Sequence, residues 1–142
     1  MLPWSGLPVT VMSTHIDMFG HVNHTRYLEY MEWARFAWAA HLGTPLPELV
    51  RDQGVGPAII RATLSFRREC RLGDELLVTV RAVSARRGIG RLHQDIVDRH
   101  SGERVCDAEM AFVMLDLATR KAVPLPPFFL TQLPAQVATL GA

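Results

Sequence analysis

Residues 15–35 read HIDMFGHVNHTRYLEYMEWAR, and the fold of the chain is decided here. The first ten of these residues include three histidines, one aspartate and one asparagine, and the rest are mostly aromatic or aliphatic. Asparagine is favoured at the start of a helix, where its side chain accepts a hydrogen bond from a free backbone N–H. Asn23 therefore marks a helix start, and a polar loop leads directly into that helix.

The predicted helix begins at residue 23 or 24, ends at residue 42 and is apolar on nearly every side. Gly43 and Pro45 follow it and are typical helix-stop signals. One side carries apolar residues at helical spacing, namely Tyr27, Met31, Ala34, Trp38 and Leu42. Trp33 and Phe36 lie on the opposite side together with Glu29 and Glu32, for which a solvated or interface role is expected. Such a helix is usually enclosed by protein on more than one flank.

Other segments of the chain alternate between apolar and polar residues, as strands do. The predicted strands span residues 7–14, 60–67, 76–82, 89–98 and 105–117, and the strand at 60–67 is expected to have one buried face. Residues 43–57 read as a loop, and the four prolines of residues 123–142 leave room for a short helix at most. Tight turns between the later strands imply antiparallel pairing. The chain is therefore predicted to be one α+β domain, residues 1–142, with a curved antiparallel sheet of about five strands wrapped around one long helix.

Composition narrows the possible partners. A chain of 142 residues with 49% apolar content can bury one substantial core, and a net charge of +1 gives no reason to expect nucleic acid. The sequence shows no basic leader and no apolar run near the roughly 20 residues that span a bilayer, so a cytoplasmic location without membrane association is expected. Cys70 and Cys106 are far apart and lack the spacing of a zinc site, so no metal is expected.

The loop motif and the order of elements together resemble the hotdog fold, and specifically acyl-CoA thioesterases of the 4-hydroxybenzoyl-CoA thioesterase-like family. Residues 17–27, DMFGHVNHTRY, carry an aspartate, then Gly-His-Val-Asn and then a tyrosine, as the family signature does. Residues 66–76, FRRECRLGDEL, and residues 115–126, LDLATRKAVPLP, are similar to later strands of the family. Phe19 stands where acyl-carrier-protein thioesterases often have a polar residue, which weighs against that substrate.

The resemblance implies hydrolysis of an acyl-CoA to the free acid and CoA, with coenzyme A present only as part of the substrate and no separate cofactor. Asp17 is the only carboxylate of the loop, and it serves either as nucleophile or as general base on water. Backbone N–H groups near His24 and Thr25 are expected to bind the oxyanion, because the first amides of a helix have no partner within it. A single sheet covers only one flank of the helix, so a homodimer, or a dimer of such dimers, is also expected.

The other loop residues receive more than one interpretation. His21 either polarises the substrate and tunes Asp17, or fixes the turn by packing against Asn23. Asn23 is expected to cap the helix and position its amides, and the His24 side chain is expected to line the acyl pocket. Substrate contacts are further assigned to Gly20, Thr25 and Tyr27.

Coenzyme A carries phosphates that guanidinium groups bind well. Two clusters could do so: Arg67, Arg68 and Arg71 form the first, and Arg86, Arg87 and Arg91 form the second. The alternative is that both clusters are basic turns exposed to solvent, without contact with phosphate.

Two other functions compete with hydrolysis: a hotdog hydratase or dehydratase, and a module that binds an acyl thioester or a partner without turnover. The presence of Asp17 argues against a module that binds without turnover.

Overall fold

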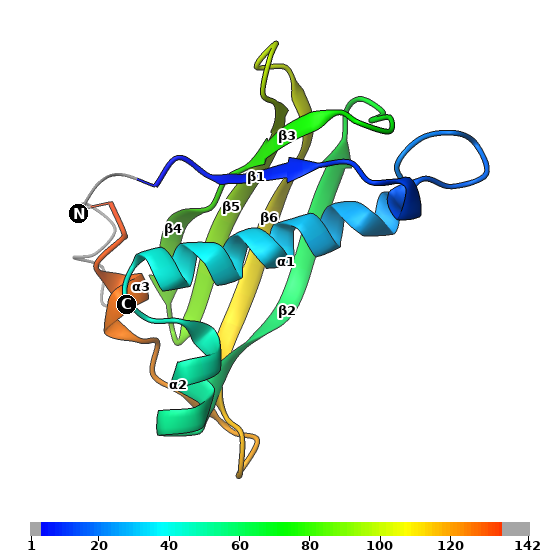
Figure 1. Ribbon diagram of the computed structural model, residues 1–142. Coiled ribbons are helices and arrows are strands. Elements are labelled where there is room, and N and C mark those ends of the chain that lie inside the picture. Colours follow the sequence, from blue (N-terminus) through cyan, green and yellow to red (C-terminus); the bar gives the residue numbers. More distant parts are fainter. Residues whose placement is uncertain (1–3, 135–142) are drawn as a thin grey trace.

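A long helix, α1 (His24–His41), crosses the concave side of an antiparallel sheet in the computed structural model, which describes residues 4–134 (Figure 1). The strands are β1 (Leu7–Thr10), β2 (Val55–Phe66), β3 (Glu75–Val78), β4 (Arg81–Arg86), β5 (Ile89–Asp98), β6 (Arg104–Asp116) and β7 (Ala122–Val123). Two short helices, α2 (Leu46–Gln53) and α3 (Pro127–Leu130), lie near the C-terminal end of α1. The predicted α+β architecture, a curved antiparallel sheet around one long helix, is confirmed.

The sheet follows the order β1-β3-β5-β6-β2, with β4 also pairing β5 and β7 also pairing β6, so the described residues form seven strands where about five were predicted. The single strand predicted at residues 76–82 is wrong. Thr79 interrupts it, because its Oγ1 accepts the Asp95 N–H at 3.1 Å while its own N–H donates to the Asp95 carbonyl at 2.9 Å. The Thr79 side chain thus takes the place of a backbone carbonyl in one hydrogen bond between the strands. Strand β3 ends before this residue and β4 begins after it.

Helix α1 provides much of the core. Asn23 caps it as predicted, accepting the Thr25 N–H at 3.0 Å. The buried side consists of Tyr27, Tyr30, Met31, Ala34, Trp38 and Ala39. It packs against the inner face of β6, where Cys106, Ala108, Met110, Phe112 and Met114 are buried. On the opposite side Trp33 and Phe36 are 40% and 44% exposed, so one copy of the chain leaves part of its central helix uncovered.

Three predicted boundaries are wrong. The loop expected at residues 43–57 contains α2, which begins after Pro45 with a second proline in its first turn, a position where proline is compatible with a helix. Gly54 ends α2 in the left-handed region at φ 65°, and β2 starts directly after it at Val55. The first strand ends at Thr10, because a 3₁₀ turn, Ser13–His15, follows. The short C-terminal helix is confirmed as α3, and residues 135–142 lie outside the described chain.

Strand β2 forms an edge of the sheet and is more exposed than predicted. Ile60 and Phe66 are each 54% exposed, so the expected buried face is wrong for this strand. Strand β6 pairs it on one side, and nothing in residues 4–134 pairs its other edge. Within the same residues, no helix combines the length and the hydropathy needed to cross a bilayer.

Candidate active site

Asp17 lies in a tight turn that precedes α1. Its N–H donates to the His21 carbonyl at 3.0 Å, and its own carbonyl accepts the Gly20 N–H at 3.1 Å. Gly20 adopts φ 85°, a conformation that favours glycine. The Asp17 side chain is half-buried, and its Oδ1 accepts the Phe19 N–H at 2.9 Å. No partner of Oδ2 is found in residues 4–134, so one carboxylate oxygen holds the turn and the other is available to a substrate or a water molecule.

The start of α1 leaves one amide without an acceptor. Asn23 donates its N–H to the His15 carbonyl at 3.0 Å, and the Thr25 N–H is taken by the Asn23 side chain. The His24 N–H has no acceptor within the described chain. Of the two amides considered from the sequence, that of His24 is therefore the one left without an acceptor, and it lies at the positive end of the helix dipole.

The loop histidines point in different directions. His21 Nδ1 lies 3.3 Å from the Val22 carbonyl and its Nε2 lies 3.8 Å from Glu69. Within the described residues, no hydrogen bond or ion pair joins it to the Asp17 or the Asn23 side chain. The exposed His24 ring meets the edge of Phe66, with 6.3 Å between ring centroids. Nowhere in residues 4–134 do three or more His, Cys, Asp or Glu side chains form a group that could hold a metal ion.

His15 was not singled out by the sequence, and it connects the loop to the core. Its buried Nδ1 lies 3.2 Å from the Met12 N–H and 2.8 Å from the Tyr30 hydroxyl. Because a backbone N–H can only donate, Nδ1 is the acceptor and the Tyr30 hydroxyl donates to it. Burial raises the pKa of Tyr30 to about 12, so it stays protonated. Tyr27 is also buried, and burial followed by the neighbouring Cys70 thiol raises its pKa well above the ordinary range.

The two arginine clusters lie at opposite ends of the sheet. The first lies near the Asp17 loop, since Val22 donates its N–H to the Cys70 carbonyl, but its guanidinium groups are already paired with carboxylates. The pairs are Arg67 with Asp107, Arg68 with Asp98 and Glu103, and Arg71 with Glu69. Arg86 and Arg87 form an exposed turn next to the Phe112 end of β6, six residues or roughly 20 Å from its Cys106 end. Within one copy they do not reach Asp17.

A cavity of about 540 Å³ opens between α1, α2, α3, β2 and β6. Its walls are mostly apolar, with Trp38, Phe112 and Phe129 among them, and Glu32 and Arg35 contribute the charged groups. None of the Asp17 loop residues lines it. Arg35 follows His24 by 11 residues along α1, or roughly 16 Å. The sequence does not reveal this cavity, because the glycines and prolines of residues 43–57 indicate a loop where α2 forms one wall.

Comparison with known proteins identifies the family. A family model described as the thioesterase-like superfamily matches residues 11–133. The chain belongs to the thioesterase-like superfamily. The resemblance noted in the sequence is thereby confirmed.

Relatives of this thioesterase-like chain are named as thioesterases, and two of the three below are named for a CoA thioester. The long-chain acyl-CoA thioesterase FadM of Escherichia coli K12 is 31% identical over 117 residues, which cover 82% of this chain and 87% of that protein. The crystal structure of the probable thioesterase YbaW from Escherichia coli has a TM-score of 0.76 at 28% identity, covering 91% of this chain and 96% of that one. Slr0204 of Synechocystis, a 1,4-dihydroxy-2-naphthoyl-CoA thioesterase, shares the fold with a TM-score of 0.80 at 21% identity, covering 89% of this chain and 92% of its own.

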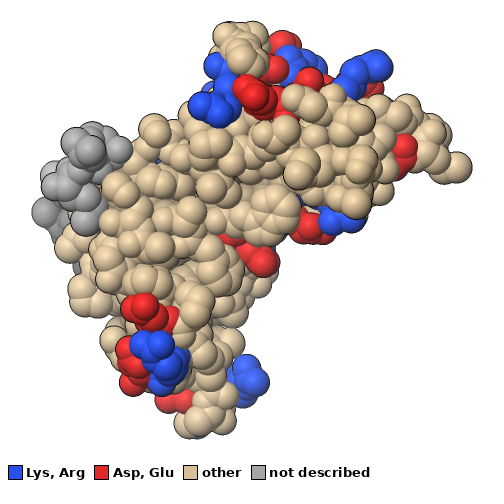
Figure 2. Space-filling model, viewed as in Figure 1, with Lys and Arg blue, Asp and Glu red and all other residues tan. Residues whose placement is uncertain are grey.

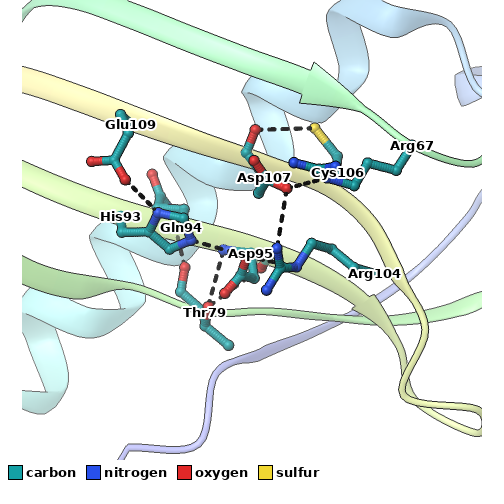
Figure 3. Close-up of polar contacts among 9 residues, drawn as sticks. All are labelled: Arg67, Thr79, His93, Gln94, Asp95, Arg104, Cys106, Asp107 and Glu109. Atoms are coloured by element: carbon teal, nitrogen blue, oxygen red, sulfur yellow. Dashed lines mark hydrogen bonds and ion pairs between the residues drawn. The ribbon is translucent and has the colours of Figure 1, made fainter.

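A polar network lies on the face of the thioesterase-like sheet opposite α1 (Figure 3). Gln94 of β5 contacts α1, so its neighbours His93 and Asp95 point to the opposite face. His93 lies 2.6 Å from Glu109 through Nδ1 and 3.0 Å from Asp95 through Nε2, and Arg104 lies 3.4 Å from Asp95. Burial lowers the pKa of His93, but the hydrogen bonds with Glu109 and Asp95 outweigh it and raise that pKa above its ordinary value. Within residues 4–134, no hydrogen bond or ion pair joins these four side chains to the Asp17 loop.

Replacing His93 by Gln is expected to destabilise the chain more in acid than in alkali. Because the pKa of His93 is raised on folding, its stabilising contribution is fully present below the unfolded value near 6.5 and is lost as pH rises through the folded value. The urea midpoints should give a penalty of about 1 kcal/mol at pH 5.5 and less at pH 8.5. His100→Gln is the control, since within residues 4–134 the exposed His100 side chain forms an ion pair only with Glu75. Equal penalties for His93→Gln at both pH values would contradict the assignment.

Proposed function

We propose that the chain hydrolyses acyl-CoA thioesters to a free carboxylic acid and coenzyme A. The observation that carries the proposal is the juxtaposition of Asp17, with one free carboxylate oxygen, and the start of α1, where the His24 N–H lacks an acceptor. A thioester carbonyl needs both a group that delivers an oxygen nucleophile and a donor for the charge that develops on its oxygen. Membership of the thioesterase-like superfamily supports this reading, as does the acyl-CoA named for FadM.

Two routes are compatible with the free Asp17 oxygen. As a general base, Asp17 takes a proton from water while the water oxygen bonds to the carbonyl carbon. As a nucleophile, Asp17 bonds to that carbon itself, and water then hydrolyses the mixed anhydride. In both routes the carbonyl π electrons move to the oxygen, which accepts the His24 N–H, and the C–S bond then breaks to release the CoA thiolate, which is protonated to the thiol.

The active form is proposed to be a homodimer paired through β2. This strand is 12 residues long, forms an edge of the sheet and exposes large apolar side chains, and such an edge favours pairing with another strand. A two-fold axis pairs β2 with its copy in antiparallel orientation, so that the Phe66 end of one strand meets the Pro57 end of the other. In the same arrangement, the second copy would cover the exposed Trp33 and Phe36.

This pairing would complete an active site from two copies. Phe66 touches His24 next to the Asp17 loop, whereas Pro57 lines the cavity. The loop of one copy would therefore lie at the cavity of the other. Arg86 and Arg87 lie at the cavity end of the sheet, and no ion-pair partner of theirs is found in residues 4–134, so they are proposed to contact the CoA phosphates.

The cytoplasm is the proposed location, which agrees with the two buried cysteines, since Cys70 and Cys106 are both free thiols. No resident cofactor is required by the proposed reaction, because coenzyme A enters and leaves with the substrate.

Release of free thiol from a panel of acyl-CoAs tests the proposal directly. The panel contains short, long and aromatic acyl groups, and thiol is detected with a chromogenic disulfide. Turnover of at least one member with kcat/KM well above background is expected. Binding of acyl-CoA without thiol release would favour the non-catalytic module, and interconversion of an enoyl-CoA and a hydroxyacyl-CoA without thiol release would favour the hydratase.

A further inference from the structure

Arg35 is held in a fixed position at the wall of the cavity. The side chain is half-buried, and its Nη1 donates to Gln94 Oε1 at 2.9 Å. Gln94 is fully buried, and its Nε2 donates to the Met31 carbonyl at 3.0 Å. The same nitrogen donates to the Thr79 carbonyl at 3.3 Å (Figure 3). A buried amide with both ends bonded cannot rotate freely, so the guanidinium that it anchors is preorganised.

The charge of Arg35 is not matched by a carboxylate. Across residues 4–134, its guanidinium nitrogens form no ion pair within 4.0 Å. Burial lowers the pKa of Arg35, and the more distant Glu32 opposes that shift, but a guanidinium stays protonated at neutral pH. The face of the molecule that carries α1 bears few other charges, most of which gather at its two ends (Figure 2). A partly desolvated cation beside an apolar cavity favours an anionic ligand.

We propose that this cavity binds carboxylic acids with an apolar body, with the carboxylate on Arg35 and the hydrocarbon against side chains such as Trp38 and Phe129. One guanidinium suits a monoanion, and the mostly apolar walls suit a hydrocarbon chain rather than a further charged group. Hydrolysis of an acyl thioester releases an acid of this class. The inference rests on the proposed function for the origin of that acid, but binding of the acid involves no thioester.

Glu32 allows the predicted effect of charge on the affinity for the acid to be tested in the opposite direction. It lines the same cavity, is exposed, and makes no ion pair with Arg35. Its charge repels a bound carboxylate but acts little on a neutral ligand. Glu32→Gln should therefore strengthen binding of the acid, whereas Arg35→Met should weaken it, and neither should change binding of an uncharged ligand with the same chain.

Isothermal titration calorimetry with octanoate and with 1-octanol tests this pair of effects on the full chain. Octanoate is expected to bind at one site per protomer, at least about tenfold more weakly to Arg35→Met and about twofold to threefold more tightly to Glu32→Gln. The affinity for 1-octanol should be equal in all three proteins, which also shows that the cavity is intact in the variants. Failure of octanoate to bind the wild type, or equal octanoate affinity in wild type and Arg35→Met, would overturn the proposal. Thiol release is measured separately from octanoate binding, so an inactive chain that binds octanoate refutes only the hydrolysis.

Discussion

Replacement of Asp17 by Asn is expected to lower kcat for acyl-CoA hydrolysis by a factor of about 10² to 10⁴, the range typical of a lost catalytic acid or base. An asparagine amide neither takes the proton of water at neutral pH nor acts as a useful nucleophile. It does keep an oxygen at the position of Oδ1, so the hydrogen bond from the Phe19 N–H survives. The turn should therefore persist, and the loss should appear in kcat with little change in the thermal midpoint.

Asp116→Asn is the matched control for this substitution. Asp116 Oδ1 accepts the Ala118 and Thr119 N–H groups in a turn at the end of β6, so the chemical change and the local setting are the same. Hydrogen bonds from these two N–H groups lower the pKa of Asp116, as expected for a carboxylate with a structural role. This variant should keep wild-type kcat. Undiminished activity of Asp17→Asn would remove Asp17 from the mechanism.

Mixing two inactive variants is expected to restore about a quarter of the wild-type activity. The first is Asp17→Asn, and the second is Val50→Trp, which fills the cavity from a position on α2 that is 41% exposed and so tolerates a larger side chain. Random pairing makes half of the dimers mixed. In each mixed dimer, one of the two sites combines an intact Asp17 loop with an intact cavity from the other copy.

The two variants are unfolded together in urea and refolded, and thiol release is measured against each variant refolded alone. Gln53→Trp serves as the control for the added indole, since Gln53 is exposed at the end of α2 and does not line the cavity. If each site lay within a single copy, a mixture of the two variants would stay as inactive as its components. Recovery near a quarter would instead establish both the homodimer and its shared site.

The feature that the sequence predicted best is set by local rules. Helix α1 could be placed within one or two residues, because Asn23 caps it and its buried side chains recur at helical spacing. Asp17 was singled out as the only carboxylate in a short polar loop whose motif resembles the family signature, and its catalytic role stays a prediction. Neither conclusion required knowledge of a contact between distant parts of the chain.

The features that the sequence missed depend on distant contacts or on exceptions to local rules. The break between β3 and β4 depends on Thr79 bonding to Asp95 of another strand, which the alternating pattern alone does not reveal. Helix α2 was hidden by prolines that normally indicate a loop but are tolerated in a first helical turn. The role of Arg35 depends on Gln94, 59 residues away, and Asp107, the partner of Arg67, is 40 residues away in the sequence.

Within one copy, the Asp17 loop and Arg35 are separated by roughly 16 Å along α1, and this separation has an evolutionary consequence. Substitutions in α2 or α3 can reshape the cavity without disturbing the loop to which the hydrolysis is assigned in our proposal. Selection for a new acid and selection for rate therefore act on different residues. A lineage with this layout can diversify its ligands by drift in one short helix while its chemistry is inherited unchanged.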